Sequence, residues 1–256
     1  MPQDVIKSVG RVFEILEYFE EVGRPLSLNE LSTHFRYPTS STAAMLKSMM
    51  HLGYLNYDAK SRTYMPTPRL AELGAWALDA FLHEDELVAA INRLSQRTGE
   101  TVAVAVQSDL YAQYLHVAYP DEPLQFRIKP GALRSVTASG MGWMLLSAQE
   151  DSAIELLWRR SNRARDRKPA LSTLATLMKR VRDAREQGFV VSRHTVTQGA
   201  GIIAMLLPSA FFGRALAIGV GGPVWRMDEK YDLILKEMRS IVSQFPKPRK
   251  KRLVKS

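Results

Sequence analysis

A run of four hydroxyl side chains opens a segment with helical periodicity, and a lysine follows further along the same segment. Two more basic residues stand shortly after it, in the turn of a predicted hairpin. Hydroxyls exchange hydrogen bonds with base edges and phosphates, and lysine and arginine neutralise phosphates. The expected contacts to double-stranded DNA are therefore Thr39, Ser40, Ser41, Thr42, Lys47, Lys60 and Arg62.

The loop Thr137-Ala138-Ser139-Gly140-Met141-Gly142 could bind a small molecule, because it stands directly before a helical run. Free backbone N–H groups at a helix start bind anions, although the same glycines could serve packing alone. No Asp or Glu occurs between Gln187 and Met227, so a pocket here suits an anion or a neutral apolar molecule. The expected polar contacts are Ser139, the backbone of Gly140, Met141 and Gly142, and Arg127 or Arg193. Alternation along the strands predicts pocket walls from Met141, Ile203, Met205 and Ile218.

The histidines do not form a metal site. No two of His34, His51, His83, His116 and His194 share metal-ligand spacing. We therefore expect no metal, no cofactor and no catalytic residue. One alternative stays open, a small-molecule hydrolase, which needs a nucleophile beside a base; Ser139 with His194 is the candidate pair.

Residues 199–204 match the dinucleotide pattern G-x-G-x-x-A. That pattern should open a helix and precede an acid about 20 residues further on. An apolar run of β type follows instead, and the acid is missing. We interpret these glycines as permitting a tight entry into a strand.

Composition excludes several classes of protein. The chain has 256 residues, 46% of them hydrophobic and 24% charged, which is typical of soluble globular proteins. No apolar stretch approaches the roughly 20 residues of a membrane helix. The N-terminus lacks the pattern of a signal peptide. There is no cysteine, hence no disulfide and no thiolate chemistry. We expect a cytoplasmic protein without a membrane partner.

Three helices and a hairpin are predicted to position the hydroxyl run. A first helix ends at Gly23, and a second begins at Ser27 with Glu30 as its capping-box partner. The third helix runs from the hydroxyls to Gly53. Strands at residues 54–57 and 63–65 then follow, which completes a winged helix-turn-helix over residues 1–66. The alternative is a module of the same shape used for protein contacts.

The rest of the chain divides into three parts. Residues 67–84 read as a linker helix that also packs on a second subunit through Leu70, Leu73, Trp76, Ala77 and Phe81. Residues 85–246 mix strands, among them 101–107, 111–118 and 124–128, with helices, among them one from Thr173 to Gly188. This indicates an α+β domain. Residues 247–256 hold six basic groups and no acid, and are expected to be a disordered tail.

Five strings in this order resemble the IclR-type transcriptional regulators. They are SVGRVFEILEYFEEVGRPLSLNELS, YPTSSTAAMLKSMMHLGYL, TGETVAVAVQ, SVTASGMGWMLLS and GAGIIAMLLPS…ALAIGVGGP, and the resemblance spans roughly residues 6–246. It implies a winged helix-turn-helix, a linker helix and a GAF-like effector-binding domain. It also implies homodimers or tetramers on palindromic operators and small carboxylic or aromatic effectors.

The chain departs from the family pattern at three places. The third helix usually carries a basic residue near its middle, where this chain has Ala44 and Met45, so Lys47 is its only cation. An acidic pair is replaced around Ser192-Arg193-His194. A strand that usually carries a cysteine and a proline has Gly201 or Ile202 and Leu206 instead. We therefore expect a more apolar pocket and a larger or aromatic effector. A ligand-binding protein without specific DNA binding remains an alternative.

Overall fold

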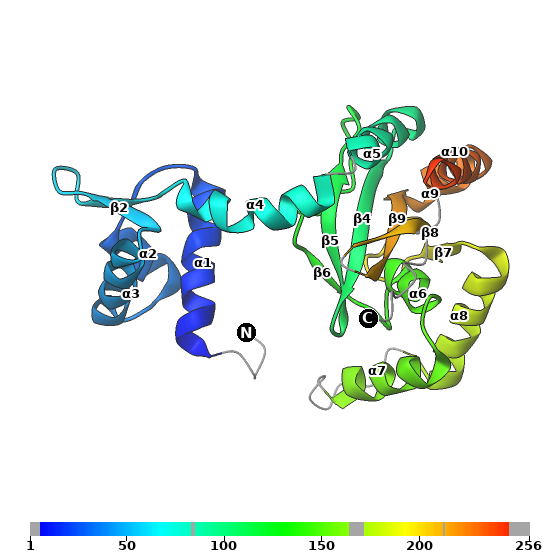
Figure 1. Ribbon diagram of the computed structural model, residues 1–256, viewed down its shortest axis with the longest axis horizontal. Coiled ribbons are helices and arrows are strands. Elements are labelled where there is room, and N and C mark those ends of the chain that lie inside the picture. Colours follow the sequence, from blue (N-terminus) through cyan, green and yellow to red (C-terminus); the bar gives the residue numbers. More distant parts are fainter. Residues whose placement is uncertain (1–5, 83–84, 164–171, 212, 246–256) are drawn as a thin grey trace, which may run out of the picture. The chain divides into compact units, whose positions relative to one another are not determined.

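The computed structural model describes residues 6–82, 85–163, 172–211 and 213–245. Within them the chain forms two compact units, which divide after Ala80, inside a helix (Figure 1). The first unit is built around one buried cluster and the second around two, and each unit is described by itself. The predicted basic tail and His83 lie outside the described residues.

The first unit contains helices α1 (Lys7–Val22), α2 (Leu28–Phe35), α3 (Thr39–His51) and α4 (Arg69–Leu82). Its strands β1 (Leu26–Ser27), β2 (Leu55–Asp58) and β3 (Thr63–Pro66) form an antiparallel sheet in the order β1-β3-β2. Ile15, Leu31 and Leu46, one from each of the first three helices, are fully buried in its core. This is the predicted helix-turn-helix with its hairpin.

Local sequence signals explain the ends of these helices. Gly23 takes a left-handed φ of 66° and its N–H donates to the carbonyl of Phe19, which ends α1. Ser27 and Glu30 form the predicted capping box at the start of α2, with the Ser27 N–H donating to Glu30 Oε2 at 2.8 Å. Both predicted helix ends are confirmed.

The second unit contains an antiparallel sheet of six strands in the order β6-β5-β4-β9-β8-β7. The strands are β4 (Thr101–Ser108), β5 (Tyr111–Ala118), β6 (Leu133–Ser135), β7 (Val190–Arg193), β8 (Ala200–Phe211) and β9 (Arg214–Pro223). The helices are α5 (Asp85–Thr98), α6 (Gly140–Leu146), α7 (Asp151–Arg163), α8 (Leu174–Gln187), α9 (Val224–Glu229) and α10 (Tyr231–Gln244). The predicted α+β class is confirmed. The strand expected at 124–128 is wrong, because these residues form no strand and β6 occupies the edge position beside β5.

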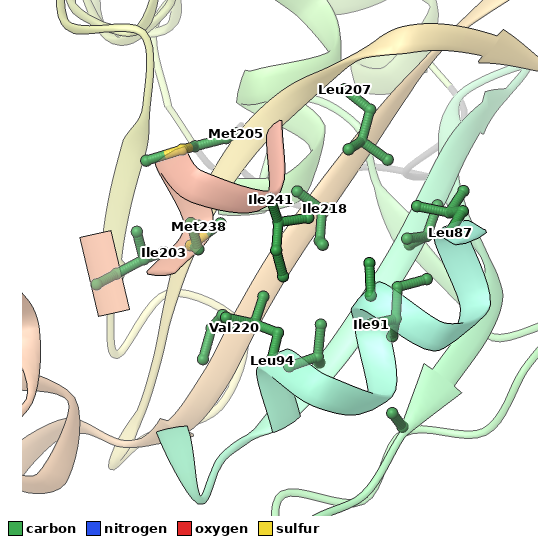
Figure 2. Packing of buried hydrophobic residues seen from close by; sticks show 14 of the residues in the cluster. Leu87, Ile91, Leu94, Ile203, Met205, Leu207, Ile218, Val220, Met238 and Ile241 are labelled. Carbon is green, nitrogen blue, oxygen red and sulfur yellow. The ribbon is translucent and has the colours of Figure 1, made fainter. Parts of the chain in front are cut away.

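Helices cover both faces of this sheet. On one face, helices α5 and α10 pack on the odd-numbered side chains of β8 and on the even-numbered side chains of β9. Figure 2 shows this packing for Leu87 and Ile91 of α5, Met238 of α10, Met205 of β8 and Ile218 of β9. On the other face α6, α7 and α8 pack on the alternate residues. The sheet is therefore buried on both sides, and α6 lies against β8 and β9.

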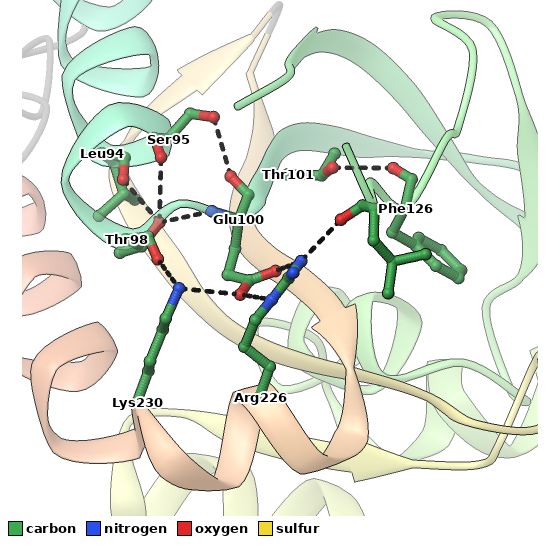
Figure 3. Close-up of polar contacts among 9 residues, drawn as sticks. Leu94, Ser95, Thr98, Glu100, Thr101, Phe126, Arg226 and Lys230 are labelled. Atoms are coloured by element: carbon green, nitrogen blue, oxygen red, sulfur yellow. Dashed lines mark hydrogen bonds and ion pairs between the residues drawn. The ribbon is translucent and has the colours of Figure 1, made fainter. Parts of the chain in front are cut away.

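A buried ion pair fastens the corner between α5 and β4 to α9. Glu100 has no exposed surface, and its Oε2 accepts a hydrogen bond from Arg226 Nη2 at 2.8 Å (Figure 3). Lys230 Nζ lies 3.3 Å from Glu100 Oε1 and donates to the Thr98 carbonyl at 2.8 Å. Arg226 and Lys230 thus both compensate the Glu100 carboxylate, and a buried charge needs such compensation because it has lost its contact with water.

Candidate nucleic-acid interface and ligand cavity

Helix α3 has a buried stripe and an exposed face. Thr42, Leu46 and Met49 are buried at i, i+4 and i+7, and they fix the helix on the core of the first unit. Thr39, Ser40 and Lys47 are exposed. A helix held in this way leaves its exposed face open to a partner, which is the arrangement of a recognition helix in helix-turn-helix proteins.

Thr42 does not lie on that exposed face, which corrects the prediction for this residue. Its side chain has no exposed surface, and its Oγ1 donates to the Pro38 carbonyl at 3.1 Å. Ser41 is half-buried and donates to the same carbonyl at 2.9 Å. The reason is periodicity: Thr42 falls on the stripe of Leu46 and Met49, and a threonine tolerates this burial because Pro38 accepts its hydroxyl proton.

The hairpin turn presents the other two predicted cations. Lys60 and Arg62 are exposed, and Asp58 organises the turn by accepting the Lys60 N–H at 2.9 Å and the Ser61 hydroxyl at 2.7 Å. These hydrogen bonds lower the pKa of Asp58 from its ordinary value. The turn therefore holds its shape while both basic side chains remain free to meet phosphates.

Arg36, in the turn between α2 and α3, was not among the predicted contacts. Its φ is 55° and that of Arg62 is 56°, a left-handed conformation that favours glycine. Both side chains are exposed. Two tight turns of this unit thus have an arginine at a position whose backbone conformation glycine adopts at a lower energetic cost. A basic residue between two predicted helices was the signal that could have singled out Arg36.

An apolar groove of about 500 Å³ runs along α1, α3 and the first turns of α4. Phe13 is 60% exposed there, Leu52 60% and Leu73 55%. Leu70 also lines the groove, so two of the predicted subunit contacts belong to it. The side chains of Trp76, Ala77 and Phe81 lie outside the described residues. Large apolar side chains clustered at a surface indicate an interaction site.

The second unit contains a small cavity of about 50 Å³ beside the start of α6. Three of the predicted ligand contacts, Ser139, Gly140 and Met141, line it together with Ser192 and Ile202. Tyr114, Phe126 and the segment 195–197 supply other parts of the wall. Among the residues that the structure describes, no charged side chain lines the cavity. It is therefore apolar with a few hydroxyl groups.

The start of α6 is closed by its own cap. Ser139 Oγ accepts the Gly142 N–H at 3.2 Å and donates to the Ser135 carbonyl at 2.8 Å. A Cβ on Gly142 would lie 2.2 Å from the Val136 carbonyl oxygen, so this glycine serves close packing. The Ser139 hydroxyl is thus engaged within the loop, and Gly142 does not line the cavity.

Tyr114 supplies a polar group that sequence reasoning missed. It is 6% exposed, lines the cavity, and its hydroxyl has no hydrogen-bond partner among the described residues. Burial raises the pKa of Tyr114 to about 12, so its hydroxyl keeps its proton and can donate to a ligand. In the sequence, Tyr114 is one apolar position of a strand with alternating polarity, and this pattern does not distinguish a cavity residue from a residue of the core.

The predicted walls Ile203, Met205 and Ile218 lie on the opposite face of the sheet, under α5 and α10 (Figure 2). This corrects the prediction. Because both faces of β8 and β9 are buried, apolar residues occur at odd and even positions alike, and alternation cannot tell the faces apart. The cavity wall instead includes Ile202, whose side chain lies against Gly219 of β9.

Neither predicted arginine lines the cavity. Arg127 is exposed. Arg193 makes an ion pair with Asp228, with its Nε 2.8 Å from Asp228 Oδ1. The expectation of an arginine donor in this cavity is corrected as well, because one side chain points to solvent and the other is committed to an acid.

The candidate pair Ser139 and His194 makes no hydrogen bond. His194 Nδ1 accepts the Gly199 N–H at 3.1 Å, and the Ser139 hydroxyl donates to Ser135. Gly199 has a φ of 83° at the turn before β8, so the glycine pattern opens a strand. In the part of the chain that the structure describes, no group of acids and histidines could hold a metal ion. No helix there could span a membrane.

Two family models match this chain. The model "Bacterial transcriptional regulator IclR C-terminal" covers residues 84–246, and the model "IclR helix-turn-helix domain" covers residues 8–59. Among curated proteins, the HTH-type transcriptional regulator KdgR of Escherichia coli K12 is 23% identical over 89% of this chain and 86% of its own length. The repressor AllR of the same organism is 23% identical over 87% of this chain and 82% of its own length.

Solved structures agree in fold. The effector domain of an IclR-type regulator of Acinetobacter sp. ADP1 is 32% identical, with a TM-score of 0.59 over 65% of this chain and 96% of that one. An IclR homologue of Microbacterium hydrocarbonoxydans in complex with 4-hydroxybenzoate is 20% identical, with a TM-score of 0.69 over 93% of this chain and 98% of that one.

Proposed function

Because the chain belongs to the IclR family of DNA-binding transcriptional regulators with a C-terminal effector-binding domain, we propose that it binds a palindromic operator as a homodimer or tetramer in response to a small, aromatic effector. The observation that carries the DNA part is the division of α3 into a buried stripe and an exposed face with Ser40 and Lys47. A DNA-binding regulator acts where the chromosome lies, so we place it in the cytoplasm.

The apolar groove of the first unit supports self-association. Phe13 and Leu73 each expose more than half of their surface on it. A second copy of the chain would cover these side chains and arrange two α3 helices with two-fold symmetry, which palindromic half-sites require. The groove therefore supports the proposed dimer at the DNA-binding unit.

Sedimentation analysis of the full chain tests this step. Phe13→Asp with Leu73→Asp should convert the oligomer to a smaller species at micromolar concentration. Leu156→Asp is the matched control, because Leu156 is 59% exposed on α7 of the other unit. An unchanged oligomer in the double variant, or a wild-type monomer, would reject the groove as the subunit contact.

The cavity beside α6 supports the effector part of the proposal. A cavity of about 50 Å³ admits little more than a water molecule, so a larger ligand must displace neighbouring side chains. Met141, whose unbranched side chain can change rotamer, lines it together with Ile202. An aromatic ring of the ligand would pack against these side chains in place of their present neighbours. The Tyr114 hydroxyl would donate a hydrogen bond to an oxygen of the ligand. An effector changes DNA binding only through unequal affinity for two arrangements of the protein.

Calorimetry with 4-hydroxybenzoate as the probe tests the cavity. The solved homologue binds this compound, and its ring and phenol suit apolar walls with a tyrosine. Tyr114→Phe should weaken binding by about tenfold, the worth of one hydrogen bond. Tyr111→Phe, on the same strand but 39% exposed, is the control. Equal affinity of wild type and Tyr114→Phe would place the effector elsewhere.

We propose no catalytic activity. Hydrolysis would require a nucleophile activated by a base. The Ser139 hydroxyl donates instead to a backbone carbonyl, and His194 accepts from a backbone amide. The named relatives are transcriptional regulators and repressors.

A further inference from the structure

A second cavity of the effector-binding unit, of about 340 Å³, lies between α6, α8 and β7. Trp143, Arg180 and Gln187 line it, with Arg193 and Thr195 at its β7 end. It shares Ser192 and Thr195 with the cavity beside α6 but differs from it in character, because Arg180, Asp183 and Arg193 belong to its wall. Its volume is sufficient for a small organic molecule.

Arg180 is the distinctive residue of this cavity. Its guanidinium lies over the Trp143 ring, with Cζ 4.1 Å from the ring centroid. Trp143 is 4% exposed, and its Nε1 donates to the Thr137 carbonyl at 3.0 Å, so the ring is fixed. Arg180 is half-buried, and among the described residues it has no acidic partner and no hydrogen-bond acceptor for its five N–H groups.

The other charged residues near Arg180 form ion pairs that do not include Arg180. Asp183, one turn along α8, has its Oδ2 3.3 Å from Lys179 Nζ. Arg193 is paired with Asp228. Arg180 therefore remains as the unneutralised cation of the cavity within the described residues. Partial burial also lowers the pKa of Arg180 from its ordinary value, because the guanidinium has lost part of its solvation.

We propose that this cavity is a second ligand site, distinct from the cavity beside α6, and that Arg180 binds the carboxylate of a small organic acid there. One face of the guanidinium is occupied by Trp143, so its free edge is what a ligand meets. A planar carboxylate matches two N–H groups on that edge. A phosphate carries more charge than one arginine neutralises, so a carboxylate is the favoured oxyanion.

The site can be tested on the full chain by nuclear magnetic resonance. The indole N–H signal of Trp143, identified with a Trp143→Phe variant, is followed while sodium acetate is added at constant ionic strength. A parallel titration uses inorganic phosphate. We expect a saturable shift with acetate and a weaker response to phosphate. No saturable shift with acetate, or tighter binding of phosphate, would overturn the carboxylate site.

Charge variants assign the binding to Arg180. Arg180→Gln should weaken acetate binding by about tenfold or more, and Arg180→Lys should weaken it less, because lysine keeps the charge but not the planar fork. Arg182→Gln removes the same charge from an exposed residue of α8 that does not line the cavity, and it should bind as wild type, as should Tyr114→Phe. Wild-type binding by Arg180→Gln, or an equal loss in Arg182→Gln or Tyr114→Phe, would contradict the proposal.

Discussion

A Cβ atom added at Gly219 would lie 2.6 Å from Met141 Cε and 2.9 Å from Ile202 Cδ1. The bare backbone of β9 thus makes room for the side chain of Met141, which comes from α6. Met141 and Ile202 fill space that a ligand could otherwise occupy. Met141 and Ile202 both line the cavity, so their positions affect its size.

Gly219→Ala should therefore disturb the cavity. The new methyl group must displace Met141 and Ile202, and such overpacking costs about 1–3 kcal/mol of unfolding free energy. Gly221→Ala is the matched control on the same strand, since its Cβ would have its nearest neighbour at 3.5 Å, an ordinary contact. Denaturant unfolding of both variants measures the difference. Equal stabilities would show that the cavity side chains adapt freely.

Tyr114 should make stability depend on pH in the alkaline range. Its pKa is about 12 in the folded protein because of burial, against 10.0 for an ordinary tyrosine. Between these values the unfolded chain loses a proton that the folded chain keeps. Stability from Tyr114 is complete below pH 10 and falls as pH rises toward 12, by about 2–3 kcal/mol in total.

Unfolding of wild type and Tyr114→Phe at pH 9 and pH 11 measures this contribution. The wild type should lose more unfolding free energy over the interval than the phenylalanine variant, because all other groups are shared. Parallel losses in the two proteins would mean that the Tyr114 hydroxyl is solvated in the folded state.

Lys47 should contribute one phosphate contact. It is exposed on α3 and has no acidic partner among the described residues. Lys47→Ala should weaken DNA binding and reduce the slope of log affinity against log salt by about one. Lys179→Ala, an exposed lysine of the other unit, should leave the slope unchanged. A wild-type slope for Lys47→Ala would show that this side chain faces away from the DNA.

The ion pair between Glu100 and Arg226 should be essential for the second unit. Arg226→Met leaves the fully buried Glu100 with Lys230 as its remaining cation, so the cost should approach but not reach the ~3–5 kcal/mol of an unpaired buried charge. Arg193→Met, which breaks the exposed pair with Asp228, should cost about 1 kcal/mol or less. Thermal unfolding compares the two, and adding Glu100→Gln to Arg226→Met should recover part of the loss.

The parts of the fold that could be predicted were those with local signals. The capping box of Ser27 and Glu30 and the left-handed Gly23 and Gly188 mark helix ends in the sequence itself. The face of a strand buried on both sides has no such signal, and the side chains of Ile203, Met205 and Ile218 were therefore assigned to the wrong face. The predicted position of Thr42 is wrong for a similar reason. A hydroxyl side chain on a helix is expected to be exposed, but Thr42 is buried and its hydroxyl donates a hydrogen bond to the Pro38 carbonyl.

The tertiary features of the sites could not be predicted for a related reason. Within the described residues, the Tyr114 hydroxyl has no hydrogen-bond acceptor and Arg180 has no acidic partner, and these two absences single the residues out. Such absences depend on which segments meet in space. The sequence pattern showed an acid-poor stretch at residues 187–227, but not that Arg193 would be neutralised by Asp228 from just beyond it.

Selection of bound duplexes from a random DNA library, using the full chain, tests the central claim most directly. We predict enrichment of an inverted repeat whose half-sites are centred about 10 base pairs, or a multiple of that, apart, as two symmetry-related α3 helices require. Recovery of duplexes with no shared sequence after repeated rounds would contradict the account, because exposed residues of α3 would then bind only the phosphate backbone.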